Sequence, residues 1–129
     1  MTAKLLSPDD LRAKPAREDF ITLPDSLGTR FLLTVDTEEE FDWSAPFDRE
    51  SRRVTIGESM QCGQNYFRAA GVRPLYVTDY PVIDDPRVGP MLAEWQAEDE
   101  ADIGAHCHPW VNPPHEEAVS ATNSFAGNL

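Results

Sequence analysis

The sequence predicts an α/β fold built on a parallel sheet, and the order of its segments is the basis of this prediction. Three short apolar segments, at residues 31–35, 75–78 and 102–107, have the length and composition of strands. Two segments with apolar residues at helical spacing separate them, at residues 55–70 and 85–98. Strands joined through a helix usually run parallel, so we expect two β-α-β crossovers.

An N-terminal extension is expected before the domain. Residues 1–28 hold no lasting periodic pattern, because Pro15, Pro24 and Gly28 interrupt it. The domain is then expected to span residues 29–129. At 129 residues the chain has room for one adequate core and not for a second domain.

The first strand is expected to start at Phe31. Its apolar residues follow one another with little alternation: Phe31, Leu32, Leu33 and Val35. Such continuous runs are typical of parallel strands that are buried on both faces. We therefore expect this strand to lie inside the domain.

The first helix is expected to begin with a capping box formed by Thr55 and Glu58, whose side chains would satisfy free backbone N–H groups of the first turn. Gly71 is suited to the left-handed conformation that ends many helices, and the second strand follows directly after Pro74. The second helix is expected between residues 85 and 98, although Pro90 restricts where its regular part begins.

The charge of the chain excludes some partners. With 23 acidic residues against 11 Lys and Arg, the formal net charge is -12, which repels phosphate backbones and anionic membrane surfaces. We expect no nucleic acid and no membrane as partner, and the lack of an apolar signal segment favours a cytoplasmic protein. Cys62 and Cys107 are expected to be free thiols, the latter buried.

Polar side chains gather where the first and third strands end. Five carboxylates follow the first strand: Asp36, Glu38, Glu39, Glu40 and Asp42. His106 and His108 stand at the end of the third strand, and the carboxyl ends of parallel strands meet at one edge of a sheet. Alternation along the chain places Asp36 beside Glu38 and pairs the two histidines. The two pairs are therefore expected to converge on one point.

Two neutral imidazoles with one or two carboxylates form a ligand set that suits zinc, and a catalytic site leaves one position for a water whose pKa falls toward ~7. A further carboxylate could serve as general base. Each half alone also has a plainer interpretation, as a solvated acidic loop or as satisfied polar histidines. Trp43 and Trp110 lie just beyond the two halves, where they could line a sugar-binding groove or simply pack.

These segments make the chain resemble the polysaccharide deacetylase superfamily, also called the NodB-homology domain or carbohydrate esterase family 4. Residues 34–36, Thr-Val-Asp, match the start of its first motif, Thr-Phe-Asp-Asp. Residues 102–106, Asp-Ile-Gly-Ala-His, match its second motif, which contains Gly-x-His. The resemblance is greatest to divergent members that carry Val-Asp-Thr-Glu-Glu-Glu-Phe-Asp-Trp together with His-x-His-Pro-Trp.

The resemblance implies that Asp36 is the catalytic base and that His106 is a metal ligand. The chain departs from the family pattern at two positions. Thr37 replaces the metal-binding second aspartate, and Trp110 stands where the second histidine is expected. We infer that a carboxylate and an imidazole nearby substitute for them.

The substitute ligands are expected to be Glu38 and His108, with zinc as the metal. The fold that the resemblance implies is an irregular (β/α)7-type deacetylase barrel, of which this chain would hold the N-terminal β/α units. The later motifs of the family do not occur in the sequence, so we expect a chain truncated at its C-terminus. An open sheet edge would then favour self-association or complementation by the missing part.

Together, the residues and the resemblance predict a metal-dependent hydrolase that removes N-acetyl groups from a carbohydrate. The chain alone would be inactive if the missing part supplies needed groups. One alternative is a non-catalytic carbohydrate- or metal-binding module derived from the same fold. Another is an amidohydrolase that acts on a small amide other than a sugar, because a fold does not determine its substrate.

Overall fold

The computed structural model describes residues 14–120 and residue 124 of the chain. The chain divides into two units, Met1–Phe31 and Leu32–Leu129, and each is described by itself. In the first unit, residues 14–31 are exposed throughout. Residues 1–13 of the expected extension lie outside the described part.

The first unit contains two short 3-10 helices, η1 (Arg17–Asp19) and η2 (Asp25–Leu27). Neither helix buries a residue. Gly28 ends the second of them with a φ of 60°, a backbone conformation that glycine adopts readily because it has no Cβ. This segment therefore has no core of its own among its described residues.

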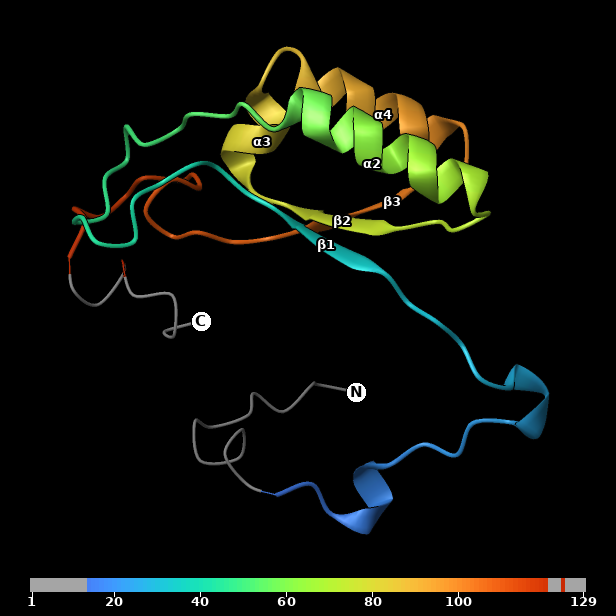
Figure 1. Ribbon diagram of the computed structural model, residues 1–129. Coiled ribbons are helices and arrows are strands. Elements are labelled where there is room, and N and C mark those ends of the chain that lie inside the picture. The colour runs from blue at the N-terminus through green and yellow to red at the C-terminus, as the bar shows by residue number, and fades with distance from the viewer. Residues whose placement is uncertain (1–13, 121–123, 125–129) are drawn as a thin grey trace. The chain divides into compact units, whose positions relative to one another are not determined.

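The second unit contains a parallel sheet of three strands, which confirms the predicted α/β class (Figure 1). The strands are β1 (Thr34–Thr37), β2 (Leu75–Thr78) and β3 (Asp102–Ala105). They lie in the order β1-β2-β3, and β1 and β3 each pair with β2 in parallel. Within the described residues the sheet is open, with β1 and β3 as its edges.

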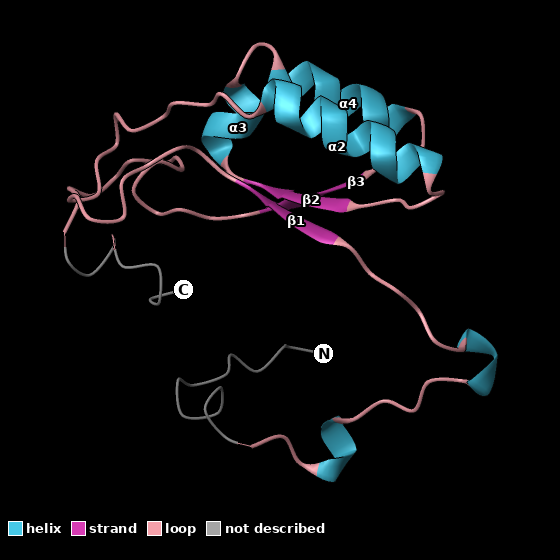
Figure 2. Ribbon diagram, viewed as in Figure 1, coloured by secondary structure: helices cyan, strands magenta, loops and turns pink. Residues whose placement is uncertain are grey.

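Three helices cover one face of this sheet, as Figure 2 shows. They are α2 (Gly57–Ala69), α3 (Tyr80–Asp84) and α4 (Val88–Ala97). The core lies between these helices and the sheet and consists of eight buried apolar residues: Val54, Met60, Tyr76, Val82, Val88, Leu92, Trp95 and Ala101. No helix among the described residues is long and apolar enough to cross a membrane.

The first strand differs from the prediction. Phe31 and Leu32 are 78% and 86% exposed, and β1 begins only at Thr34. Burial on both faces was wrong because the described helices cover a single face. Val35 packs against the core on that face, so the alternating Asp36 projects from the opposite one.

The predicted capping box was also wrong. The Thr55 hydroxyl and backbone N–H both donate to the Glu40 carboxylate, and α2 begins after Ile56 without a side-chain cap. The Glu40 carboxylate, in the loop after β1, therefore accepts the hydrogen bond that the Thr55 hydroxyl was expected to make within the helix. Gly71, with a φ of 65°, ends the first helix as expected.

The sequence did not reveal α3. Asp79 follows β2 directly and caps this helix, since its Oδ1 accepts the N–H of Val82 at 3.1 Å. Pro81, in the first turn, lacks the N–H that would otherwise need a partner there. The turn of α3 places Asp79 at the carboxyl end of the sheet, next to the residues described below.

Candidate metal centre

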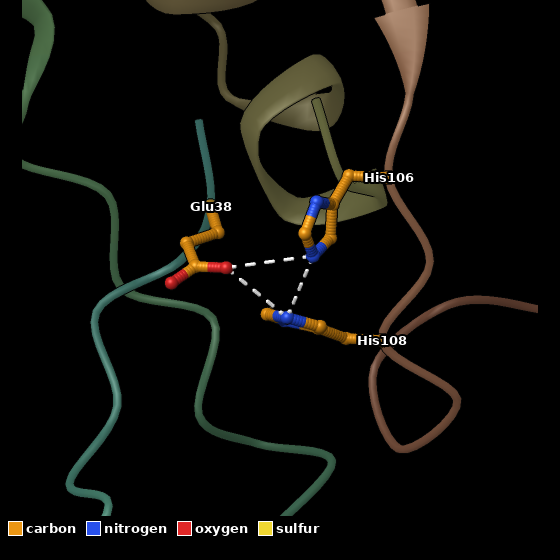
Figure 3. A group of neighbouring side chains, drawn as sticks. All are labelled: Glu38, His106 and His108. Atoms are coloured by element: carbon orange, nitrogen blue, oxygen red, sulfur yellow. Dashed lines mark hydrogen bonds and ion pairs between the residues drawn. The ribbon is translucent and has the colours of Figure 1, made fainter. Parts of the chain in front are cut away.

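Three of the four side chains that were expected to converge do so at the carboxyl edge of the sheet (Figure 3). Glu38 directly follows β1, whereas His106 and His108 follow β3. The two Nε2 atoms of the histidines are 3.0 Å apart. The Glu38 Oε2 atom lies 3.1 Å from Nε2 of His108 and 3.5 Å from Nε2 of His106.

These separations are close to the distances between the donor atoms around a bound metal ion. In a tetrahedral zinc site each donor lies about 2.0–2.1 Å from the metal, which places neighbouring donors about 3.3–3.4 Å apart. The three donor atoms span 3.0–3.5 Å, so an ion can lie between them with small adjustments. Glu38, His106 and His108 therefore form a group that could hold a metal ion.

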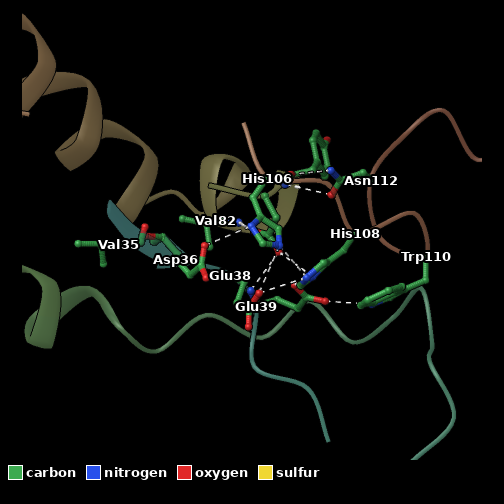
Figure 4. A network of polar contacts seen from close by, with 12 residues as sticks. Val35, Asp36, Glu38, Glu39, Val82, His106, His108, Trp110 and Asn112 are labelled. Carbon is green, nitrogen blue, oxygen red and sulfur yellow. Dashed lines mark hydrogen bonds and ion pairs between the residues drawn. The ribbon is translucent and has the colours of Figure 1, made fainter. Parts of the chain in front are cut away.

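His108 is held from its other side by Glu39 (Figure 4). The His108 Nδ1 atom lies 2.8 Å from Oε2 of Glu39, and the Trp110 indole N–H donates to Oε1 of the same carboxylate at 3.0 Å. The side chain of Glu39 is fully buried, and that of His108 is 5% exposed. This carboxylate therefore has a fixed orientation between two donors.

Asp79 connects Glu39, and through it His108, to the rest of the fold. Its Oδ2 atom accepts the backbone N–H of Glu39 at 3.0 Å while its Oδ1 caps α3. Its side chain is also fully buried. The end of β2, the loop after β1 and the start of α3 thus meet at one aspartate.

The buried acids and the histidine shift one another's protonation. Burial and the neighbouring Glu39 carboxylate raise the pKa of Asp79 to about 7. Burial also opposes ionisation of Glu39, but hydrogen bonds from His108, Asp79 and Trp110 outweigh it and lower the pKa of Glu39. For His108, burial is outweighed by Glu39 and the other nearby carboxylates, which raise its pKa. These opposite shifts favour ionisation of Glu39 over ionisation of Asp79.

His106 has a looser environment. Its Nδ1 atom lies 3.5 Å from Oδ1 of Asp36, beyond a good hydrogen bond, and the Asp36 side chain is 71% exposed. The backbone of His106 is better fixed, because the Asn112 side chain donates to its carbonyl at 3.1 Å and accepts the N–H of Tyr80 at 3.2 Å. Asp36 thus lies on the Nδ1 side of the ring, away from the Nε2 atom that faces Glu38.

A second group, Glu39, Asp79 and His108, also brings potential ligand atoms together. All three residues are buried, and their polar atoms already bond with one another, with Trp110 and with the start of α3. A metal would have to break these bonds in a closed space. We therefore assign this second group to the support of the centre rather than to metal binding.

The two tryptophans have different surroundings. Trp110 is 1% exposed, and its ring stacks on His108 at 4.4 Å and on Phe47 at 4.1 Å between ring centroids. This environment favours the packing alternative for Trp110. Trp43 is 65% exposed and contacts Phe41, with 4.2 Å between the ring centroids. Its face is the more accessible of the two.

Two cavities flank the centre. One has a volume of about 370 Å3 and combines aromatic, acidic and small residues: Phe41, Asp42, Ala45, Pro46, Phe47, Asp48, Glu50, Ser51 and Trp110. The other, of about 390 Å3, is bordered by His106 and includes the apolar side chains of Ile83, Ile103 and Pro113. Of the three residues of the centre, only His106 lines one of these two cavities.

Sequence reasoning missed the supporting residues. Glu39 was one acid among five, and Asn112 gave no pattern that tied it to the histidines. From its place at the end of the second strand, Asp79 could be expected to point toward the site, but not to hold Glu39. The available signal for its capping role was its position, directly after a strand and before a proline-containing turn. Cys107 was wrongly expected to be buried, because it belongs to the loop beyond β3 and is exposed. Both cysteines are free thiols, as predicted.

Comparison of the chain with protein-family models, with curated proteins and with solved structures found no match. The resemblance to the polysaccharide deacetylase superfamily therefore stays a prediction from two sequence motifs. The functional argument depends on the geometry of the centre.

Proposed function

We propose that the protein is a zinc-dependent hydrolase of the polysaccharide deacetylase type, which removes N-acetyl groups from a carbohydrate. The observation that supports this best is the convergence of Glu38, His106 and His108 with donor spacings that suit zinc. Three protein ligands leave a tetrahedral ion one position for water or substrate. This open position is what distinguishes a catalytic zinc site from a structural one.

Zinc in this centre would supply a Lewis acid for the amide carbonyl and a water of lowered pKa. The protein's own task is to remove a proton from the attacking water. Asp36 is suited to this task, since its carboxylate is 71% exposed and lies beside His106. Hydrolysis would cleave the carbon–nitrogen bond and release acetate and a free amine.

The two cavities suggest how a sugar substrate would lie. The cavity beside His106 has apolar walls that suit the methyl group of an acetyl substituent. The cavity bordered by Phe41 and Phe47 offers aromatic surface for a sugar ring and carboxylates that accept bonds from hydroxyl groups. Trp43 would extend the aromatic surface. A carbohydrate is thus a better fit than a phosphorylated ligand, which the acidic rim would repel.

The barrel to which this sheet would belong is part of the same proposal. Sequential parallel strands with helices on one face are compatible with the first units of an irregular (β/α)7-type barrel, whose interior would lie on the uncovered face. Asp36 projects from that face. Further strands, from another chain or from a longer form of this one, would enclose the centre.

The first test is metal content. Protein that is folded by circular dichroism is expected to bind close to one zinc per chain by elemental analysis, and the His106→Ala/His108→Ala double variant is expected to bind none. The Asp36→Asn variant is expected to retain zinc but to lose about 10²- to 10⁴-fold in acetate release from N-acetylated chitooligosaccharides.

The outcomes separate the alternatives. A folded wild-type chain without zinc would contradict the proposal. Zinc binding and saccharide binding without any acetate release would instead favour the non-catalytic module. Full activity of Asp36→Asn would show that another group takes the proton.

A further inference from the structure

We propose that Glu39 is a positioning residue that holds His108 in one tautomer, with the proton on Nδ1 and a free lone pair on Nε2. This inference deepens the proposed function, because it rests on the same metal centre and names the residue that prepares one of its ligands. It concerns a state of the metal-free protein, so it can be tested without any activity.

The hydrogen-bonding capacities of the two side chains carry the argument. An ionised carboxylate can only accept hydrogen bonds, and two carboxylates face the ring: Glu39 Oε2 lies 2.8 Å from Nδ1 and Glu38 Oε2 lies 3.1 Å from Nε2. The contact with the fully buried Glu39 is the shorter one, and His108 Nε2 can instead accept from His106 Nε2 at 3.0 Å, so the geometry favours the proton on Nδ1. A neutral imidazole has a single N–H, and its other nitrogen must then be a lone-pair donor. That nitrogen is the Nε2 atom that faces Glu38 and His106.

The Glu39 carboxylate is held in this orientation by further hydrogen bonds. Its second oxygen accepts the Trp110 indole N–H at 3.0 Å, and Asp79 holds its backbone N–H at 3.0 Å. All of these side chains are buried. The orientation of the His108 ring is therefore determined by three segments of the fold before a metal binds.

The indole makes a sharp test available. Trp110 can only donate through its ring nitrogen, so a glutamine at position 39 must present its carbonyl oxygen to the indole. The glutamine NH2 group would then point at His108 Nδ1, which could only accept. The proton would move to Nε2, on the side that faces the metal. Glu39→Gln thus inverts the tautomer with almost no change of volume.

The experiment is nitrogen NMR of the His108 ring in the metal-free protein, at a pH where the imidazole is neutral, together with zinc affinity from a competition titration. The wild type is expected to show the Nδ1–H tautomer. The Glu39→Gln variant is expected to show the Nε2–H tautomer and to bind zinc about 10- to 100-fold more weakly. A merely structural role would not exchange the tautomer.

Two variants complete the design. Glu58→Gln makes the same chemical change at an exposed position of α2 and is expected to leave the His108 signals and the zinc affinity unchanged. In the Glu39→Gln/Trp110→Phe double variant the amide is free to turn, so part of the lost affinity is expected to return. No recovery in a folded double variant would contradict the tautomer mechanism.

The wild-type spectrum is decisive even if Glu39→Gln fails to fold. An Nε2–H tautomer in the metal-free wild type would overturn the inference. Failure of the proposed function looks different, because a chain that binds no zinc can still show His108 protonated on Nδ1. The two failures are therefore distinguishable.

Discussion

The two histidines of the centre present the same Nε2 atom to the same point but differ in how they are held. His108 is 5% exposed, and its Nδ1 lies 2.8 Å from a fully buried carboxylate. His106 is 25% exposed, and its Nδ1 lies 3.5 Å from a carboxylate that is itself 71% exposed. One imidazole is fixed by the fold, and the other can adjust.

This difference has a physical use. A ligand that is oriented in advance contributes its full affinity without loss of side-chain freedom on binding. A second imidazole that can adjust would allow the donor atoms to shift from their present separations of 3.0–3.5 Å to the separations of about 3.3–3.4 Å expected around a bound zinc ion. Asp36, the carboxylate beside this looser histidine, is 71% exposed, as the proposed proton transfer would need, whereas Glu39 is buried and already accepts two hydrogen bonds.

The largest expected effect is on stability without metal. His108→Ala removes the partner of a buried ionised Glu39 and is expected to lower the free energy of unfolding by about 3–5 kcal/mol. His106→Ala removes a partly exposed ring and is expected to cost about 1 kcal/mol. Urea denaturation of the metal-free variants measures both values. Equal losses would contradict the distinction between a fixed and a loose histidine.

Much of the fold could be predicted from local patterns. β2 and α4 lie where the sequence places them, because short apolar runs and helical spacing are local signals. The errors at Phe31 and Thr55 have a different origin. Whether a strand is covered on one face or two, and whether a hydroxyl caps its own helix or bonds a distant acid, depends on contacts between segments that one stretch of sequence does not contain.

The candidate metal centre shows the same contrast between local signals and contacts between distant segments. Glu38, His106 and His108 were found because strand ends and alternation are regular features of parallel sheets. The supporting roles of Glu39 and Asp79 were not foreseen, since they arise from a bond that joins residues 40 positions apart. The proximity of these three side chains could thus be predicted from the sequence, whereas the contacts that orient His108 required the structure.

A smaller effect is expected in the pH dependence of the free energy of unfolding, through the titration of buried Asp79. The folded-state pKa of Asp79 is about 7, above its ordinary value of 3.8. Between these values the folded state holds one more proton than the unfolded state, so this contribution to stability is full below about pH 4 and is lost as the pH rises toward 7. The Asp79→Asn variant cannot titrate at this position.

The measurement is the difference in unfolding free energy, wild type minus Asp79→Asn, for metal-free protein between pH 4 and 7. This difference is expected to fall with rising pH by at most about 1.4 kcal/mol per pH unit. Asp84→Asn, at an exposed position of α3, the helix that Asp79 caps, serves as the control. A flat or rising difference would contradict a buried, protonated Asp79 and weaken the view that Glu39 alone carries the charge of the pair.

The smallest expected effect is that of Asp36→Asn on zinc affinity. Outer carboxylates that bond a metal-binding histidine change affinity about 10- to 100-fold when altered, but Asp36 is 3.5 Å from His106 and largely exposed. Its replacement should therefore change the zinc dissociation constant far less than Glu39→Gln, although acetate release falls. A competition titration on both variants tests this order. An equally large loss for Asp36→Asn would mean that His106, too, is held by its carboxylate, and the two histidines would then be alike.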